Sequence, residues 1–148
     1  MMITRYGESR IALSMYQKGQ GFIGAAVLVD QQDGHPSVVL HLLCQGIEIL
    51  LKAILLATDY EHYQPRLRKF GHDLVKIATE ARAATGLHIF SGTSAGELQT
   101  LSDFYRKHLL RYASAFDFYI DPSTIPSRRV LMHAFAILKH VEKRALFA

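Results

Sequence analysis

A stripe of polar side chains runs through the most apolar stretch of the chain, residues 37–57. The stripe consists of His41, Gln45, Glu48 and Lys52, at intervals of four, three and four positions. On an α-helix this spacing places all four side chains on one face. Glu48 and Lys52 are either a solvated i, i+4 ion pair or the lining of a groove. In a groove, a buried Glu48 would need an arginine or histidine partner from another helix.

A second group of residues combines cations with aromatic rings. It contains Tyr105, Arg106, Lys107, His108, Arg111 and Tyr112. On a helix His108 and Arg111 are i, i+3 neighbours and can act on the same target. Arginine beside tyrosine is also common on nucleic-acid-binding surfaces, through phosphate contacts and base stacking. The alternative is a solvated basic face.

Histidines elsewhere in the chain offer further chemistry. His72 follows Gly71 at the start of an expected helix, where it is either a capping residue or a positioned imidazole. His133 and His140 are seven positions apart, but no carboxylate or cysteine stands at matching spacing, so we expect no metal site. The candidates for catalysis are therefore His72, Arg106 and His108, and no cofactor is expected.

The elements that must position these side chains are helices. Apolar residues recur at helical spacing in five stretches: residues 8–30, 37–58, 72–84, 97–118 and 127–146. Residues 31–36 and 121–126 form turns, while residues 59–71 and 86–96 are expected to be loops. Three glycines in the first stretch, Gly19, Gly21 and Gly24, indicate close helix packing or a kink. We predict one domain over residues 1–148, all-α, an up-and-down bundle of four to five helices around residues 37–57.

Composition narrows the class of protein. The chain has 148 residues and one cysteine, which excludes an internal disulfide framework and favours a reducing, cytoplasmic setting. The formal charge of +4 allows contact with an acidic partner without requiring it. Residues 37–57 are long enough to cross a membrane. However, Glu48 and Lys52 near their middle favour a buried core helix instead, and the first ten residues do not form a signal peptide.

Three short segments together resemble the HEPN family of small helical bundles. They are residues 46–53, 71–74 (Gly-His-Asp-Leu) and 109–112 (Leu-Leu-Arg-Tyr). The resemblance implies a helical bundle that commonly dimerises. Some members are metal-independent ribonucleases of toxin–antitoxin or defence systems, and others accompany nucleotidyltransferases as binding modules without chemistry of their own.

The ribonuclease branch of that family uses an arginine followed, after four to six residues, by a histidine on a late helix. In this chain Arg106 and His108 have only Lys107 between them. Suitable spacings occur elsewhere, in Arg66 with His72 and in Arg128 with His133. Such spacings arise easily in a chain with eight histidines. Because the Arg–His pair on the late helix departs from the ribonuclease pattern, we expect a non-catalytic module, and an endoribonuclease is the alternative.

The expected function is a HEPN-like module that binds a nucleotide, RNA or a protein partner. The expected ligand-binding residues are Glu48, Lys52, Arg106, His108, Arg111 and Tyr112. The partners that the resemblance implies are a second copy of the chain, and a nucleotidyltransferase or an antitoxin. A purely structural dimerisation module is the third alternative. Within the site, we expect Arg111 to pair with Glu48, because a guanidinium can bind a carboxylate through two hydrogen bonds.

Overall fold

The computed structural model describes every residue except 1, 88–89, 91, 113–118, 145–146 and 148, and for 143–144 it describes only the backbone. Over the described residues the chain is all-helical and contains no β-strand, so the predicted all-α class is confirmed. More than five helical elements are present, because segments expected to be loops also form helical turns.

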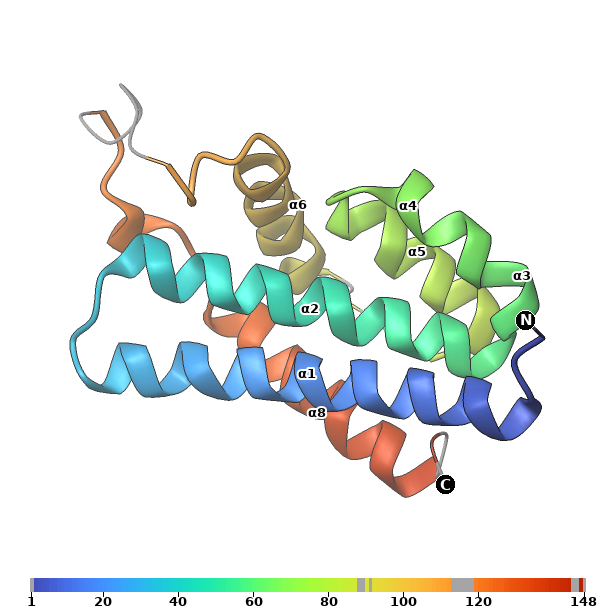
Figure 1. Cartoon of the computed structure of the whole chain (residues 1–148). Helices are drawn as coiled ribbons and strands as arrows, with labels where there is room; N and C mark the ends of the chain where they lie inside the picture. Colours follow the sequence, from blue (N-terminus) through green and yellow to red (C-terminus); the bar gives the residue numbers. More distant parts are fainter. Residues whose placement is uncertain (1, 88–89, 91, 113–118, 145–146, 148) are drawn as a thin grey trace.

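The longest elements are α1 (Arg5–Gln31) and α2 (Pro36–Thr58), which form an antiparallel hairpin (Figure 1). The side chain of Thr4 accepts a hydrogen bond from the backbone of Gly7 and so caps α1. Pro36 occupies the first position of α2, where its missing N–H costs no helical hydrogen bond. The predicted start of α2, residue 37, is therefore one position from the observed start, whereas α1 begins three positions before the predicted residue 8.

Helices α1 and α2 touch through glycines. A Cβ added at Gly19 would lie 2.9 Å from the backbone nitrogen of Leu50, and one added at Gly46 would lie 2.9 Å from that of Ile23. Real Cβ atoms do not approach so closely, so both positions require glycine. Gly24 has open space around it. The predicted close packing is therefore confirmed at Gly19 alone among the three glycines of α1 that suggested it.

Residues 59–71 were expected to be a loop, but residues 60–70 fold into successive short helical turns. These are α3 (Tyr60–Tyr63), a 3₁₀ turn η1 (Gln64–Arg66) and α4 (Leu67–Phe70). Pro65 lies in the first turn of η1, where proline is tolerated. The chain then turns at Gly71, with a φ of +56°, and α5 (Leu74–Thr85) begins at Asp73, whose side chain accepts from the backbone of Lys76.

The last two long helices are α6 (Thr93–Arg106) and α8 (Arg128–Arg144). A short 3₁₀ turn, η2 (Pro122–Thr124), precedes α8. The prediction of one helix over 97–118 is wrong at its C-terminal end, because α6 stops at Arg106 and residues 107–112 form turns. His108 there has a φ of +59°, which no α-helix contains. The rest of the expected helix, residues 113–118, lies outside the described residues.

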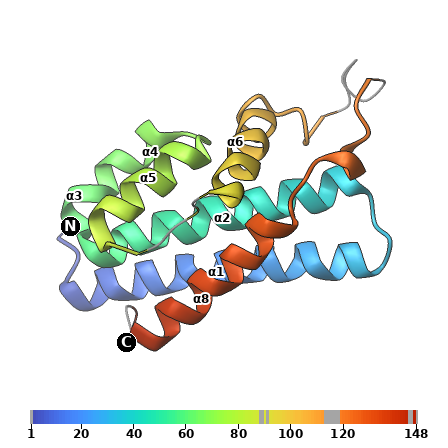
Figure 2. The same ribbon diagram turned by 180° about the vertical axis from the view of Figure 1, so that it is seen from behind.

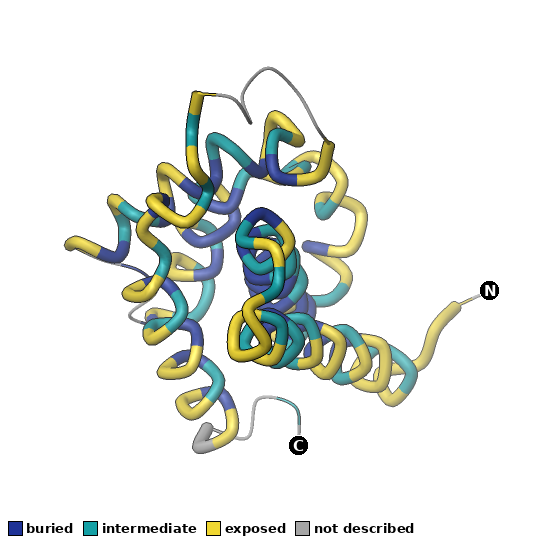
Figure 3. The backbone as a smooth tube through the Cα atoms, turned by 90° about the vertical axis from the view of Figure 1, so that its left-hand side faces the viewer, coloured by how far each residue is buried: buried dark blue, intermediate teal, exposed yellow. Residues whose placement is uncertain are grey.

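Helix α2 is the centre of the molecule. Helices α5 and α6 pack on it on the side away from α1, and α8 crosses the hairpin obliquely behind it (Figures 1 and 2). Figure 3 looks along the hairpin from its turn and shows the buried residues concentrated along α2. Within the described part of the chain, α2 is the one helix long and apolar enough to cross a membrane, and most of it is buried against its neighbours.

Candidate functional site

The carboxylate of Glu48 is the hub of a polar cluster in an otherwise apolar core. It is 7% exposed and accepts hydrogen bonds from three donors: Lys52 Nζ at 2.7 Å, His72 Nδ1 at 3.0 Å and the Tyr105 hydroxyl at 2.5 Å. These donors come from α2, from the turn before α5 and from the last turn of α6. We call Glu48 and its three donors the Glu48 cluster. It joins three elements that are far apart in the sequence.

The cluster keeps Glu48 charged and Tyr105 protonated. Burial raises the pKa of Glu48, but the hydrogen bonds from Lys52, Tyr105 and His72 outweigh burial and lower the pKa below its usual value. Burial, together with the hydrogen bond to Glu48, raises the pKa of the Tyr105 hydroxyl well above its ordinary range. Tyr105 is therefore a hydroxyl donor to an ionised carboxylate at neutral pH.

Lys52 also fixes the backbone that carries His72. Its Nζ donates to the carbonyl oxygen of Gly71 at 3.0 Å while it pairs with Glu48. The next residue, His72, is held by Glu48 through Nδ1, so its other ring nitrogen, Nε2, remains for a ligand. Since Asp73 caps α5, the alternative role of His72 as a helix cap is excluded. The structure supports the alternative of a positioned imidazole.

Beside the Glu48 cluster lies a small open cavity of about 90 Å³. We call it the histidine pocket. It is lined by His41, Gln45, His72, Tyr105, His108 and Arg111. The rings of His72 and His108 are edge to face with centroids 5.4 Å apart, and the His41 ring lies 5.6 Å from that of Tyr105. Three imidazoles and one guanidinium therefore surround one cavity.

Two groups of this pocket lack a hydrogen-bond or ion-pair partner among the residues that the structure describes. The Nδ1 atom of His41 is buried and makes no hydrogen bond to any described residue. Arg111 forms no ion pair with a described carboxylate, and its guanidinium packs over the ring of Tyr112, 5.5 Å from the centroid. Burial first, and then the charge of Arg111, lower the pKa of His41, an effect that the neighbouring Gln45 partly opposes.

The structure brings together five of the residues singled out from the sequence. Glu48 and Lys52 belong to the Glu48 cluster, His108 and Arg111 line the histidine pocket, and His72 belongs to both. The expected ion pair between Glu48 and Arg111 is not formed. Tyr105 takes that place because it lies on the last turn of α6, whereas Arg111 lies in the turns beyond the helix end.

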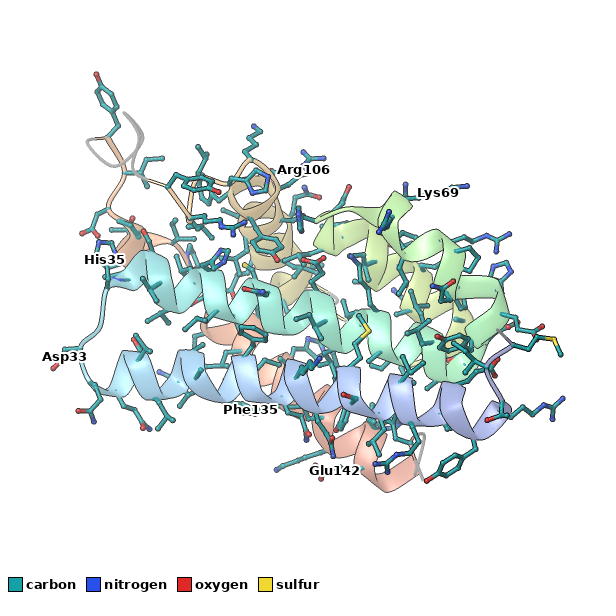
Figure 4. All side chains as sticks on the ribbon, viewed as in Figure 1. Asp33, His35, Lys69, Arg106, Phe135 and Glu142 are labelled. Atoms are coloured by element: carbon teal, nitrogen blue, oxygen red, sulfur yellow. The ribbon has the colours of Figure 1, made fainter. Side chains whose placement is uncertain are left out.

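Four of the six expected ligand-binding residues do not line the pocket. Glu48 and Lys52 belong to the neighbouring Glu48 cluster, and Arg106 and Tyr112 belong to neither. Arg106 pairs with Asp103 at 3.3 Å and Asp73 at 3.7 Å and lies at the outer end of α6 (Figure 4). Tyr112 is 61% exposed and does not line the cavity. The basic group of residues 105–112 is therefore divided between the pocket, which His108 and Arg111 line, and the surface.

Three lining residues had not been assigned to the site: His41, Gln45 and Tyr105. The first two were visible as members of the four-residue stripe, and the intervals of four, three and four were the signal that they share a face with Glu48. Tyr105 was visible only as an aromatic neighbour of Arg106. Its hydroxyl bond to Glu48 depends on the packing of α6 against α2, which no local spacing encodes.

None of the three Arg–His spacings in the sequence places both members in the pocket. Arg66 is exposed and donates to the backbone oxygen of His62, and Arg106 is held by two aspartates. His133 lies on α8, where its Nδ1 is 2.7 Å from the hydroxyl of Ser94. No group of three potential metal ligands occurs in the part of the chain that the structure describes. The arginine that does accompany the pocket histidines is Arg111.

No protein-family model, curated protein or solved structure matches this chain. The resemblance to the HEPN family therefore remains a prediction from three sequence segments. The functional inference rests on the chemistry of the histidine pocket.

Proposed function

We propose that this chain is a HEPN-like module that binds a phosphate group of a nucleotide or RNA in the histidine pocket, without chemistry of its own. One observation carries the proposal. Arg111 and three histidines surround a small cavity, and Arg111 has no ion-pair partner among the described carboxylates. A guanidinium beside imidazole donors is a suitable environment for phosphate oxygens.

The carboxylate of Glu48, which lies beside the histidine pocket, does not prevent an anion from binding there. Glu48 contacts two lining residues, His72 and Tyr105, but its charge is balanced by Lys52 at 2.7 Å. The described lining itself contains no acidic side chain. The pocket therefore presents net positive charge to a ligand, and this charge increases whenever an imidazole is protonated.

Binding of a short RNA and of adenosine monophosphate to purified variants tests the proposal. Arg111→Gln should weaken binding roughly 10- to 100-fold, the loss expected when charge-assisted hydrogen bonds disappear. Arg106→Gln is the matched control. It removes the same charge from a residue five positions earlier, whose side chain pairs with Asp73 and Asp103 and not with the pocket. Equal losses in both variants, or no loss in either, would refute specific binding at the pocket.

A metal-independent endoribonuclease is the second candidate. It is favoured by the contact between the rings of His72 and His108 beside Arg111, since two imidazoles can serve as general base and acid while arginine stabilises the phosphorane charge. RNA cleavage in EDTA should then disappear in His72→Ala and His108→Ala and persist in His62→Ala, an exposed histidine outside the pocket. Absence of cleavage by the unmodified protein would leave the binding module.

A further inference from the structure

The size of the histidine pocket limits what can enter it. Pockets that enclose drug-sized ligands occupy about 300–1,000 Å³, whereas this cavity measures about 90 Å³. A nucleoside does not fit in that space, but a single tetrahedral phosphate does. The rest of any phosphate-bearing ligand must therefore remain outside the cavity.

The donors around the cavity suit a phosphate with three free oxygens. Arg111 offers several N–H groups and Gln45 offers an amide. Because the Nδ1–H of His72 donates to Glu48, its Nε2 donates to a phosphate oxygen when the ring is an imidazolium and accepts from a protonated phosphate oxygen when the ring is neutral. The buried Nδ1 of His41, which has no hydrogen-bond partner among the described residues, is a further polar group at the cavity. An internal phosphodiester has two free oxygens and one charge. A terminal phosphate has three free oxygens and carries close to two charges at neutral pH.

The rim of the pocket offers a surface for the group attached to the phosphate. Tyr112 is 61% exposed and lies under the guanidinium of Arg111. Its ring centroid is 6.5 Å from that of His108. An exposed tyrosine ring next to an arginine is a platform on which a nucleobase can stack.

Building on the proposed function, we infer that the histidine pocket takes a terminal phosphate monoester, with the adjoining base stacked on Tyr112. The phosphate occupies the cavity between Arg111 and the three histidines. The ribose lies at the mouth of the cavity. This geometry selects the end of an RNA strand or a free mononucleotide over the interior of a strand, because an internal phosphate would have to carry a chain out of the cavity on both sides.

Four probes separate these ligands: one RNA pentamer with a 5′-phosphate, with a 3′-phosphate or with hydroxyls at both ends, and adenosine 5′-monophosphate. At least one phosphorylated pentamer should bind ten-fold or more tightly than the hydroxyl form, and inorganic phosphate should compete with it. Binding of the mononucleotide as tight as that of the better pentamer identifies a free nucleotide as the source. Much weaker binding of the mononucleotide identifies an RNA end.

The outcomes distinguish this inference from the proposed function. Equal, Arg111-dependent binding of all three pentamers would overturn the inference and leave phosphate binding intact. Binding that ignores Arg111→Gln in every probe would overturn both.

The position of the base has its own test. Tyr112→Leu should weaken binding of the preferred probe about five-fold or more, while Tyr6→Leu, which removes a tyrosine that is 76% exposed on α1, should not. Unchanged affinity of Tyr112→Leu would overturn the stacking arrangement.

Discussion

The face of α2 that packs on α1 and the face that meets α5 and α6 are built by opposite means. On the α1 side, Gly19 and Gly46 remove side chains so that two backbones come into contact. On the other side, the backbones are joined through the side chains of Glu48, Lys52 and Tyr105 and the ring of His72. The glycine contact is made by shape alone, whereas the Glu48 cluster depends on charge. One helix therefore combines a contact suited to stability with a cluster suited to positioning a site.

The largest effect should come from the apolar core of α2. Leu50→Ala removes a side chain that is 1% exposed and should lower the free energy of unfolding by about 2–5 kcal/mol, as deletion of a buried leucine does. Ile49→Ala, at a half-buried position next to it, should cost less. Chemical denaturation of both variants measures the difference. Similar small losses would mean that α2 is not the core helix.

The glycine contact predicts that two Gly→Ala substitutions change the stability of the protein in opposite directions. Gly46→Ala would place a Cβ 2.7 Å from the side chain of Ile23 and 2.9 Å from its backbone nitrogen, and should destabilise the protein by about 1–3 kcal/mol. Gly24→Ala meets open space and should stabilise α1 by about 0.5–1 kcal/mol. Thermal melts of both variants decide this. A shift of the same sign in both would contradict the close approach of α1 and α2.

The Glu48 cluster predicts that replacing Lys52 lowers the stability of the protein, although lysine is usually a surface residue. The Lys52 side chain is only 12% exposed and donates to both Glu48 and Gly71. Lys52→Met keeps the unbranched apolar part of the side chain but removes the ammonium group, which leaves both acceptors short of a donor and should cost about 1–3 kcal/mol. Lys18→Met on α1, where the lysine is exposed, should change stability by less than about 0.5 kcal/mol. Equal behaviour of the two lysines would show that the cluster contributes nothing to stability.

Acidification should remove the contribution of Glu48 and leave the glycine contact unaffected. The folded state lowers the pKa of Glu48 below its reference value of 4.5. Its stabilising effect is therefore present above pH 4.5 and is lost as the pH falls through the lowered value. The stability difference between the unmodified protein and Glu48→Gln should be largest near neutral pH and shrink below pH 4.5. The corresponding difference for Gly46→Ala should stay constant. If the stability difference between the unmodified protein and Glu48→Gln grew in acid, the pKa of Glu48 would be raised rather than lowered in the folded state.

Local spacing was enough to predict most of the helices. Apolar periodicity placed α1, α2 and α5 to within a few residues, and residues 31–36 were correctly predicted to form the turn between α1 and α2. These features act within a few residues, so they are visible without a tertiary structure. Residues 59–71 were expected to be a loop, but residues 60–70 form short helical turns, because Pro65 occupies the first turn of η1, where proline is tolerated.

The sequence by itself determined that α2 is apolar on nearly all sides and carries one polar stripe, since the intervals between His41, Gln45, Glu48 and Lys52 follow from helix geometry alone. It also determined that a buried Glu48 needs donors. Only the tertiary structure decided which donors these are. Helix α6 ends at Arg106, which leaves Tyr105 against Glu48 and carries Arg111 to the histidine pocket. The end of α6 therefore determines which residue donates a hydrogen bond to the carboxylate and which remains for a ligand.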